Sequence, residues 1–380
     1  MKLYQLNPIC AINASNDFET YYRKSWIFDF SQKIKLYYPY MIIENHFLHP
    51  RLKNKIEFNN NGIKNVIHPA TKGRIHHNDV DLFSVSFLHS IKEMKDGILI
   101  NHKPFTFLSI YLLNELKHKP YIVQTHGEGN PSLACSILRH NYRLKIMKYF
   151  EPRIIACVDY YLAGSIYERE FLRERYNNIK IRLFKGGIDF NSFKPKISKD
   201  NKKITLLYVG KFYKAKGVHI LIDAYLKLKE KYQMDLMCIG GSENDELYNF
   251  VKANANICIC RIEADKLRRF YEKADIYIMP TPKEDRVMIL GGIGTAPIEA
   301  MAHNIPVITN NLVHFPDPTK IKVIGSLGEP DYILAIENVI NTLGDFNSVR
   351  DEAIKYYDDE VVVSEYVEIC KEISQKYKLS

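Results

Sequence analysis

The sequence has little of what marks a secreted or membrane-spanning protein. Its first ten residues, MKLYQLNPIC, lack the apolar run of a signal peptide, and no window approaches the ~18 apolar residues that cross a bilayer. The seven cysteines include no CxxC pair, and Cys238, Cys258 and Cys260 lie in apolar runs where a buried thiol is expected. The sequence therefore predicts a protein of the reducing cytoplasm that does not cross a membrane.

Motifs for metal-dependent, nucleophilic or P-loop catalysis are also missing. Asp79-Val80-Asp81 imitates a DxD metal motif, but it lies in an irregular polar stretch rather than at a strand end. His68, His76 and His77 are close in sequence but lack a recognised ligand spacing. No Ser-His-Asp order and no P-loop is found. We therefore expect neither a metal nor a cofactor.

The composition is that of a globular protein with a basic surplus. Hydrophobic residues make up 46% and charged residues 26%, and 380 residues are enough for two cores. The net charge of +9 favours phosphate-bearing partners, which include nucleotides, nucleic acids and anionic lipids. Charge alone does not choose among them.

The C-terminal half alternates short β-rich runs with helical patterns. Apolar positions in Val218–Tyr232 follow a helical period of about 3.6 residues, and Ser242, with acidic residues after it, is expected to cap the next helix. This alternation is typical of βαβ units and a parallel sheet covered on both faces. The predicted strands are Ile204–Val209, Met234–Ile239, Ile257–Cys260, Ile276–Met279, Pro306–Thr309 and Ile321–Ile324.

The N-terminal half shows a looser version of the same rhythm. Helical patterns fit Pro104–Lys117, Cys135–Phe150 and Ile166–Tyr176, whereas residues 51–81, rich in Asn, His and Lys, predict a loop-rich insertion. The predicted strands are Leu3–Leu6, Tyr40–Ile43, Ile98–Asn101, Tyr121–Gln124, Ile154–Val158 and Ile181–Phe184.

Together these patterns predict an α/β protein with two Rossmann-like, doubly wound domains facing a cleft. We expect an N-terminal domain at residues 1–187, a linker at 188–203, a C-terminal domain at 204–355 and a last helical segment at 356–380. In doubly wound sheets, ligands bind outside the carboxyl ends of the strands. Motifs in strand-to-helix loops therefore carry most weight.

The first such motif is Gly210-Lys211-Phe-Tyr-Lys-Ala-Lys216-Gly217, which follows a predicted strand and opens a helix. Gly210 allows a sharp turn, and three lysines surround a helix N-terminus whose N–H groups already favour an anion. This pattern indicates a diphosphate-binding loop. A solvated basic loop is the alternative.

The second motif is Gly291-Gly-Ile-Gly-Thr-Ala-Pro-Ile-Glu299-Ala-Met-Ala302. Its three glycines permit a ligand to approach the backbone closely, and the helix that starts near Thr295 offers a second anion site. Glu299, one turn inside, is placed to accept hydrogen bonds from sugar hydroxyls. A plain core helix needs none of these features.

These motifs, with Gly240-Gly241, Ala274-Asp275-Ile276…Pro280 and Pro306-Val-Ile, resemble the retaining GT-B glycosyltransferases of family 4. The order and spacing match over about residues 204–310. Lys185-Gly186-Gly187-Ile188-Asp189, followed by Phe193 and Pro195, is similar to the interdomain segment of that family. Asp159 to Ser165 and His126 extend the resemblance to about residues 97–310.

The resemblance implies roles for several residues. Lys211 and Lys216 would hold the donor diphosphate and support the leaving group, Glu299 would contact the ribose, and Arg261 lies where the base is usually bound. The remaining donor-binding candidates are Gly210, Gly240, Gly292, Ile293, Gly294 and Thr295. The last helix would cross back to the N-terminal domain.

The sequence departs from the family in two places. Gly291 stands where the family commonly has a glutamate that faces the donor sugar, and Glu284 or Asp285 could replace it. The family's Gly-rich loop after the first strand is also absent, because Asn7–Asp17 contains no glycine.

His126 follows a predicted strand and precedes Gly127-Glu128-Gly129. The resemblance places it near the reacting sugar, so we count His126, Lys211, Lys216 and Glu284 as catalytic candidates. An ordinary loop histidine is the alternative. His102, also at a strand end, is more readily explained as structural.

The sequence thus predicts transfer of a sugar from a nucleotide-sugar donor to a glycan or lipid-linked acceptor, with retention by family analogy. The basic helices at Tyr21–Ile34 and Leu138–Tyr149 would suit peripheral docking at the inner membrane face. An epimerase or phosphorylase on the same scaffold and a non-catalytic nucleotide-sugar-binding protein are the alternatives. Nucleic-acid binding is favoured by charge alone and is not expected.

Overall fold

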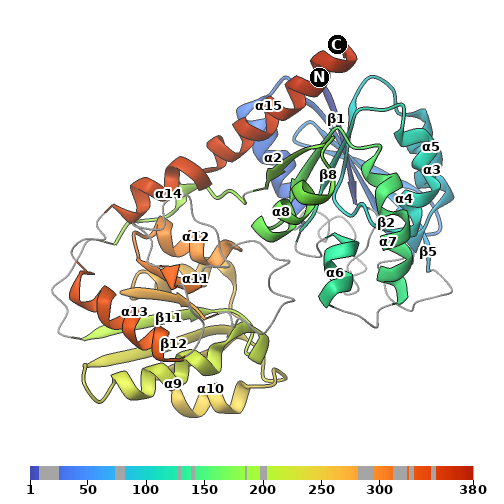
Figure 1. Cartoon of the computed structure of the whole chain (residues 1–380). Coiled ribbons are helices and arrows are strands. Elements are labelled where there is room, and N and C mark those ends of the chain that lie inside the picture. The colour runs from blue at the N-terminus through green and yellow to red at the C-terminus, as the bar shows by residue number, and fades with distance from the viewer. Residues whose placement is uncertain are drawn as a thin grey trace. The chain divides into compact units, whose positions relative to one another are not determined.

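The computed structural model describes residues 1–7, 25–72, 82–126, 130–137, 142–184, 186–196, 203–280, 294–310, 323–324, 329–343 and 348–379. The chain forms two compact units (Figure 1). The first unit is Met1–Phe184 with Val363–Ser380, and the second is Lys185–Val362. The last helix, α15 (Asp359–Tyr377), therefore starts in the second unit and ends in the first, and the segment expected as a linker groups with the second.

The first unit is built on an eight-stranded sheet of order β10-β9-β8-β7-β1-β2-β4-β3. All neighbouring strands are parallel except β3 and β4, so the predicted α/β class is confirmed. The strands are β1 (Lys2–Asn7), β2 (Ile42–His49), β3 (Ile56–Asn60), β4 (Ile63–Pro69), β7 (Ile98–Asn101), β8 (Tyr121–Gln124), β9 (Tyr160–Ala163) and β10 (Lys180–Leu183). A separate two-stranded sheet pairs β5 (Thr71–Lys72) with β6 (Leu82–Phe83).

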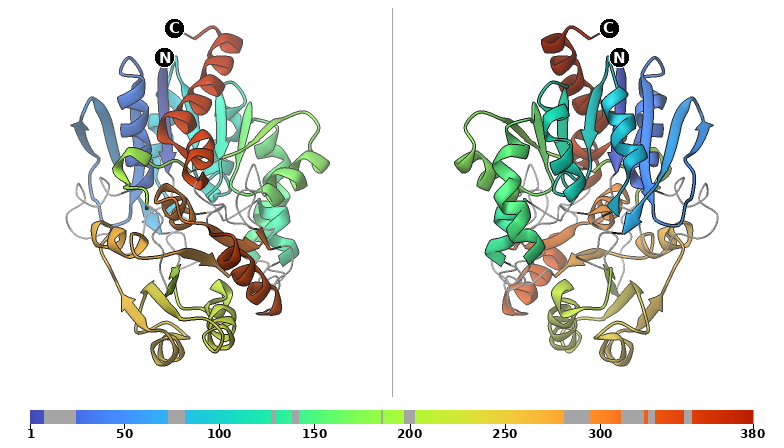
Figure 2. Two further views of the ribbon diagram at one scale, coloured as in Figure 1. Left: turned by 90° about the vertical axis from the view of Figure 1, so that its left-hand side faces the viewer. Right: turned by 90° about the vertical axis from the view of Figure 1, so that its right-hand side faces the viewer.

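Helices cover both faces of this sheet because strand side chains alternate between the faces. Tyr4, Leu99 and Tyr121 belong to the core on one face, and α2 and α15 lie on the other, where Phe30 meets Tyr366 at 4.9 Å between ring centres (Figure 2). The helices of this unit are α2 (Trp26–Tyr37), α3 (Val85–Glu93), α4 (Phe107–Tyr111), α5 (Leu113–Leu116), α6 (Pro131–Ile137), α7 (Tyr142–Ile155) and α8 (Ile166–Arg175).

Local capping explains where several helices begin. Ser25, Ser84, Thr106 and Ser165 each accept a hydrogen bond from the backbone N–H three residues later. Such caps satisfy N–H groups that have no partner inside the helix and are worth ~1 kcal/mol each.

The second unit contains a six-stranded parallel sheet of order β13-β12-β11-β14-β15-β16. The strands are β11 (Ile204–Val209), β12 (Met234–Gly241), β13 (Ile257–Cys260), β14 (Ile276–Met279), β15 (Val307–Asn310) and β16 (Val323–Ile324). The helical segments are η1 (Phe190–Ser192), η2 (Lys214–Lys216), α9 (Val218–Leu228), α10 (Tyr248–Asn254), α11 (Ala264–Tyr271), α12 (Thr295–Ala302), α13 (Glu329–Asn341) and α14 (Val349–Tyr357).

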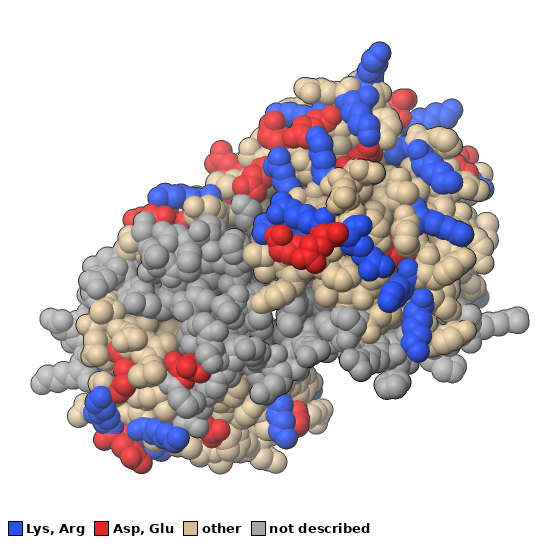
Figure 3. All heavy atoms as spheres, in the orientation of Figure 1, with Lys and Arg blue, Asp and Glu red and all other residues tan. Residues whose placement is uncertain are grey.

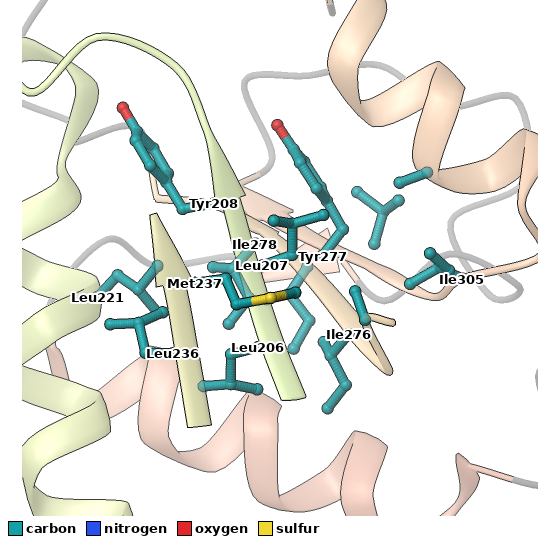
Figure 4. Packing of buried hydrophobic residues seen from close by; sticks show 14 of the residues in the cluster. Leu206, Leu207, Tyr208, Leu221, Leu236, Met237, Ile276, Tyr277, Ile278 and Ile305 are labelled. Atoms are coloured by element: carbon teal, nitrogen blue, oxygen red, sulfur yellow. The ribbon is translucent and has the colours of Figure 1, made fainter. Parts of the chain in front are cut away.

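The core of the second unit follows from its apolar strands. Leu206, Leu207, Leu236 and Ile276 are fully buried between the flanking helices, as an all-parallel sheet requires (Figure 4). In the same view, the hydroxyl groups of Tyr208 and Tyr277 point away from the aliphatic residues.

The strand order of the second unit is that of the doubly wound dinucleotide-binding fold. Counted along the chain, its strands lie in the order third, second, first, fourth, fifth and sixth, so connections run in opposite directions from β11 and β14. Ligands of such sheets bind at this switch point, outside the carboxyl ends of the two strands. In the first unit, the strands from β4 through β1 and β7 to β10 follow the same scheme, with the switch between β1 and β7.

Three predictions of local structure are wrong. The expected loop at 51–81 contains a hairpin of β3 and β4 that extends the main sheet, and its turn places Asn61 (φ 51°) and Gly62 (φ 74°) in the left-handed region, as in a two-residue hairpin loop. The run Ile154–Val158 is not a strand, because Ile154 and Ile155 end α7. Ser242 does not cap a helix, since α10 starts only at Tyr248.

Candidate functional site

The structure describes part of the predicted site. Glu284, Gly291, Gly292 and Ile293 lie outside the described residues, as do Asp285 and Asp79-Val80-Asp81. His76 and His77 are also outside them, whereas His68 is buried on β4 against His46, with 3.0 Å between Nε2 of His68 and Nδ1 of His46. The site is therefore built from residues of the β11, β12, β13 and α12 regions.

Gly210 directly follows β11 at the switch point of the second unit and lies against Tyr208. A Cβ atom at Gly210 would lie 2.9 Å from the Tyr208 hydroxyl oxygen, and that hydroxyl donates a hydrogen bond of 2.6 Å to the carbonyl of Lys211. Gly240 on the adjacent strand has φ +97°, and a Cβ there would lie 3.6 Å from the Gly210 nitrogen. The two glycines therefore bring two backbone segments close together at the carboxyl edge.

Asp245 holds the same loop from the β12 side. Its carboxylate accepts hydrogen bonds from the backbone N–H of Phe212 (2.9 Å) and of Ser242 (3.0 Å), and the residue is only 7% exposed. Burial alone would raise the pKa of Asp245, but these hydrogen bonds and one from Tyr213 outweigh burial and lower it. These hydrogen bonds attach the loop after β11 to the segment that follows β12.

The lysines of the loop differ in their surroundings. Lys211 and Lys214 are exposed and Lys216 is half-buried, and Lys214 faces Glu246 at 3.7 Å. Gly217, with φ +71°, ends η2 and precedes the first turn of α9. Cations beside the N–H groups of a helix N-terminus form a setting suited to an anion.

Helix α12, which connects β14 to β15, carries Glu299. Gly294 precedes the helix with φ +75° and has open space where a Cβ would lie, and both Gly294 and Thr295 are exposed. Glu299 is half-buried and hydrogen-bonds with Tyr271. Burial raises the pKa of Glu299, while Tyr271 and the positive charge of Arg268 oppose that rise.

Arg261 follows β13 in a left-handed backbone conformation (φ 51°), which is uncommon for a residue with a side chain. Its N–H donates to the carbonyl of Gly241 at 3.1 Å, so the turn after β13 lies beside the Gly240-Gly241 segment. The Arg261 side chain is exposed at the same carboxyl edge. Strain of this kind is often kept at binding sites.

His126 lies in the first unit, at the carboxyl end of β8. Its Nε2 is 3.0 Å from Nδ1 of His102, and Nε2 of His102 is 2.5 Å from Oε1 of Gln5. Trp26 packs on His126 with ring centres 4.7 Å apart. Burial and the charge of Lys103 lower the pKa of His126, which keeps more access to solvent than the fully buried His102.

The sequence interpretation missed Gln5, Trp26, Tyr208 and Asp245. Gln5 offered a signal, because a glutamine inside an apolar strand has to find a buried partner. Tyr208 and Asp245 offered none, since an ordinary strand tyrosine and an acidic loop residue predict no contact with a particular backbone group.

Comparisons with known proteins agree with this architecture. Residues 189–357, less than half of the chain, match the family model described as Glycosyl transferases group 1. The capsular polysaccharide biosynthesis glycosyltransferase CapM of Staphylococcus aureus is 29% identical over 178 residues, which are 45% of this chain and 45% of that protein. The chain thus spans about half the length of the first relatives that it matches.

Two solved structures share the fold over almost the whole chain. Sucrose-phosphate synthase from Thermosynechococcus elongatus has a TM-score of 0.69 at 14% identity and covers 99% of both chains. The E. coli trehalose-6-phosphate structure bound with UDP-2-fluoro glucose has a TM-score of 0.67 at 10% identity, covering 98% of this chain and 99% of the other. The predicted GT-B fold is confirmed, and the family match and the structural neighbours together support the GT-B glycosyltransferase superfamily.

Proposed function

We propose that this protein transfers a sugar from a nucleotide-sugar donor to a glycan or lipid-linked acceptor, with retention of configuration. The observation that carries the proposal is the Gly210–Gly217 loop. It lies at the switch point of the second unit and is held by Tyr208 and Asp245, with Lys211 and Lys216 beside the start of α9. The structural neighbour bound with UDP-2-fluoro glucose favours the same kind of donor.

In this proposal the second unit binds the donor. Lys211 and Lys216 neutralise the diphosphate, and the N–H groups at the start of α12, near Gly294 and Thr295, face its oxygens or the sugar. Glu299 accepts hydrogen bonds from the ribose hydroxyls, and Arg261 lies beside the base. Gly292 and Ile293 would complete this set.

The chemistry proposed for the site is stabilisation of a leaving group. When the glycosidic bond to the donor breaks, negative charge accumulates on the departing nucleoside diphosphate, and fixed cations stabilise that charge most in the transition state. The lysines take this role in the proposal, so no metal and no cofactor is invoked. His126 would contact the sugar being transferred, and Glu284 would replace the family acid absent at Gly291.

The first unit would bind the acceptor, and α7 offers a surface for one that is held in a membrane. Tyr142 and Tyr149 are 66% and 68% exposed, and Lys145, Lys148 and Arg153 are exposed on the same helix. On the face of this unit that Figure 3 shows, Lys and Arg side chains are spread among the described residues. Tyrosines with lysines are typical of helices at the surface of an anionic bilayer. Among the described residues, no helix is both long and apolar enough to cross one.

Sedimentation with vesicles tests the membrane proposal. Binding to phosphatidylglycerol vesicles should weaken with salt and fall by about 30-fold or more in Lys145→Glu/Lys148→Glu, because each basic residue near the surface contributes about 1 kcal/mol. Lys229→Glu, a charge change directly after α9 in the other unit, is the control. Equal binding by both variants would remove the membrane from the proposal.

The function itself is tested by a ligand screen followed by turnover. UDP, GDP, ADP and their sugars are screened by thermal shift, and the sugar that raises Tm most is then supplied with lipid or glycan acceptors. Product with an inverted anomeric centre would contradict retention. Donor binding without hydrolysis or transfer would instead favour a non-catalytic nucleotide-sugar-binding protein, and turnover without an acceptor would favour an epimerase.

A further inference from the structure

The switch point of the first unit is occupied by a chain of three polar side chains. Gln5 on β1, His102 directly after β7 and His126 two residues after the end of β8 are linked by contacts of 2.5 and 3.0 Å. Gln5 is fully buried and His102 is 1% exposed. Hydrogen bonds in such surroundings fix the positions of protons, because a buried donor or acceptor left without a partner is costly.

The chemistry of the Gln5 amide determines which atom donates in each hydrogen bond of this series. The amide oxygen of Gln5 faces Nε2 of His102, and an amide oxygen can only accept, so Nε2 of His102 carries a proton. Burial holds the pKa of His102 well below its ordinary value, so the ring is neutral and its Nδ1 accepts. The Nε2 of His126 must then donate the proton of the second contact.

Aromatic rings keep the two imidazoles in this arrangement. Trp26 lies 4.7 Å from the ring centre of His126 and 5.7 Å from that of His102, and Phe184 lies 6.1 Å from His126 on an edge-to-face contact. These rings offer no hydrogen-bond acceptor that competes with Nδ1 of His102. At His102, which is buried, they also disfavour a charged imidazole by excluding water.

We infer that Gln5 and His102 are positioning residues that hold His126 as the neutral tautomer with its proton on Nε2. In this state Nδ1 of His126 is a hydrogen-bond acceptor. It can accept a hydrogen bond but cannot donate one. Resting on the proposed function, the inference makes Gln5 and His102 positioning residues that set the proton of His126, the histidine counted as a catalytic candidate.

The tautomer can be measured without any activity. The whole chain is labelled with 15N-histidine, and long-range 1H–15N correlation distinguishes a proton on Nε2 from one on Nδ1. Signals are assigned with His102→Gln and His126→Gln. We expect His102 and His126 to be neutral Nε2–H tautomers at pH 7. Protons on Nδ1 of both rings would mean that the Gln5 amide nitrogen faces His102, and this result would overturn the inference.

Two variants of Gln5 test its role. Gln5→Glu keeps an acceptor and should retain the Nε2–H signals, whereas Gln5→Met removes the acceptor and should give a mixture of tautomers at His126. In turnover, Gln5→Met should lower kcat by about tenfold at unchanged donor KM, as loss of an orienting partner typically does, and Gln5→Glu should restore most of that loss. Equal kcat in the two variants would show that Gln5 does not act through a proton position.

Fluorescence of Trp26, the sole tryptophan, detects misfolding of the Gln5 variants. Its fluorescence reports whether the ring still packs on the histidines in each variant. If Gln5→Met does not fold, the spectra of the wild type and Gln5→Glu still decide the tautomer. If no sugar is transferred at all, the proposed function fails while the tautomer assignment is judged on its own signals.

Discussion

The two sheets share one strand scheme and differ in the chemistry at its switch point. In the first unit, the position between β1 and β7 is filled by Gln5 and His102, which are buried and neutral. In the second, Gly210 directly follows β11 and lies against Tyr208, and the loop that continues from it carries Lys211, Lys214 and Lys216. Under the proposed function, the same topology would supply an uncharged hydrogen-bonding site in one unit and an anion site in the other. The difference would then come from the residues at the strand ends and not from the fold.

At the amino ends of the strands, the two sheets are stabilised by similar contacts. Asp159 accepts a hydrogen bond from the N–H of Tyr121 (2.9 Å) and pairs with Lys376 (2.6 Å). Asp275 accepts from the N–H of Thr205 (2.7 Å) and pairs with Lys196 (2.5 Å). Each aspartate thus joins two neighbouring strands where they begin and ties them to a segment distant in sequence. The amino edges are alike in their stabilisation, and the carboxyl edges differ in their side chains.

The largest expected effect is on the anion site. Lys211→Ala/Lys216→Ala should weaken nucleoside diphosphate binding by about 100-fold or more, since hydrogen bonds to charged groups contribute ~1.5–3 kcal/mol each. Titration calorimetry measures this. Lys214→Ala is the matched control, because it removes the same charge from the same loop but from a lysine that faces Glu246.

The proposed contrast between the two units is contradicted if Lys214→Ala weakens nucleoside diphosphate binding as much as the double variant does. Equal losses would mean that the loop attracts anions only through its net charge. Unchanged affinity in the double variant would remove the lysines from the site altogether.

How much of this could be predicted depended on the range of the interactions involved. The strand Ile204–Val209 was predicted correctly because an apolar run followed by glycine is a local signal. The contact of Gln5 with His102 joins residues 97 positions apart, and no residue near Gln5 in the sequence indicates which partner it has. Tyr208 is similar, since its hydroxyl acts on a neighbouring backbone carbonyl only after the turn has formed.

The errors in secondary structure have equally physical causes. Short apolar runs such as residues 154–158 occur both at helix ends and in strands, so composition does not distinguish the two. The hairpin at 56–69 was hidden by its polar residues, although Asn61-Gly62 is the dipeptide that a two-residue hairpin favours. Asn45 and Asn65 show why polar residues fit there, because they hydrogen-bond to each other inside the sheet at 3.0 Å.

The second largest effect concerns the amino edges, where the units should respond alike. Asp275→Ala and Asp159→Ala each leave a backbone N–H without its acceptor and a lysine without its partner, and should each cost about 2–3 kcal/mol of unfolding free energy. Urea unfolding measures the loss, and Trp26 fluorescence isolates the first unit. An Asp159→Ala transition by fluorescence that matches the wild type would show that this edge is not stabilised as the other is.

A smaller effect is expected at Tyr208. Tyr208→Phe removes the hydroxyl that fixes the Lys211 carbonyl and should weaken donor binding by about five- to tenfold, since a neutral hydrogen bond is worth ~1 kcal/mol. Tyr225→Phe, which removes a buried hydroxyl bonded to Asn256 on the same unit, is the control. A loss of Tm without a loss of affinity would make Tyr208 a purely structural residue.

The smallest expected effect is at Glu299. It tests whether the buried carboxyl of this residue lowers the stability of the second unit while it serves donor binding. Because burial raises the pKa of Glu299, the folded protein holds its proton more tightly than the unfolded chain does. The resulting stability is present below the unfolded pKa and is lost as pH rises through the folded value. Glu299→Gln removes this loss, so its Tm relative to the wild type should be higher at pH 7.5 than at pH 4. Its donor affinity should fall at pH 7.5, because a carboxylate is a stronger acceptor than an amide. A variant that gains stability and keeps full affinity would leave Glu299 without a role in donor binding, and the anion site would then rest on the lysines alone.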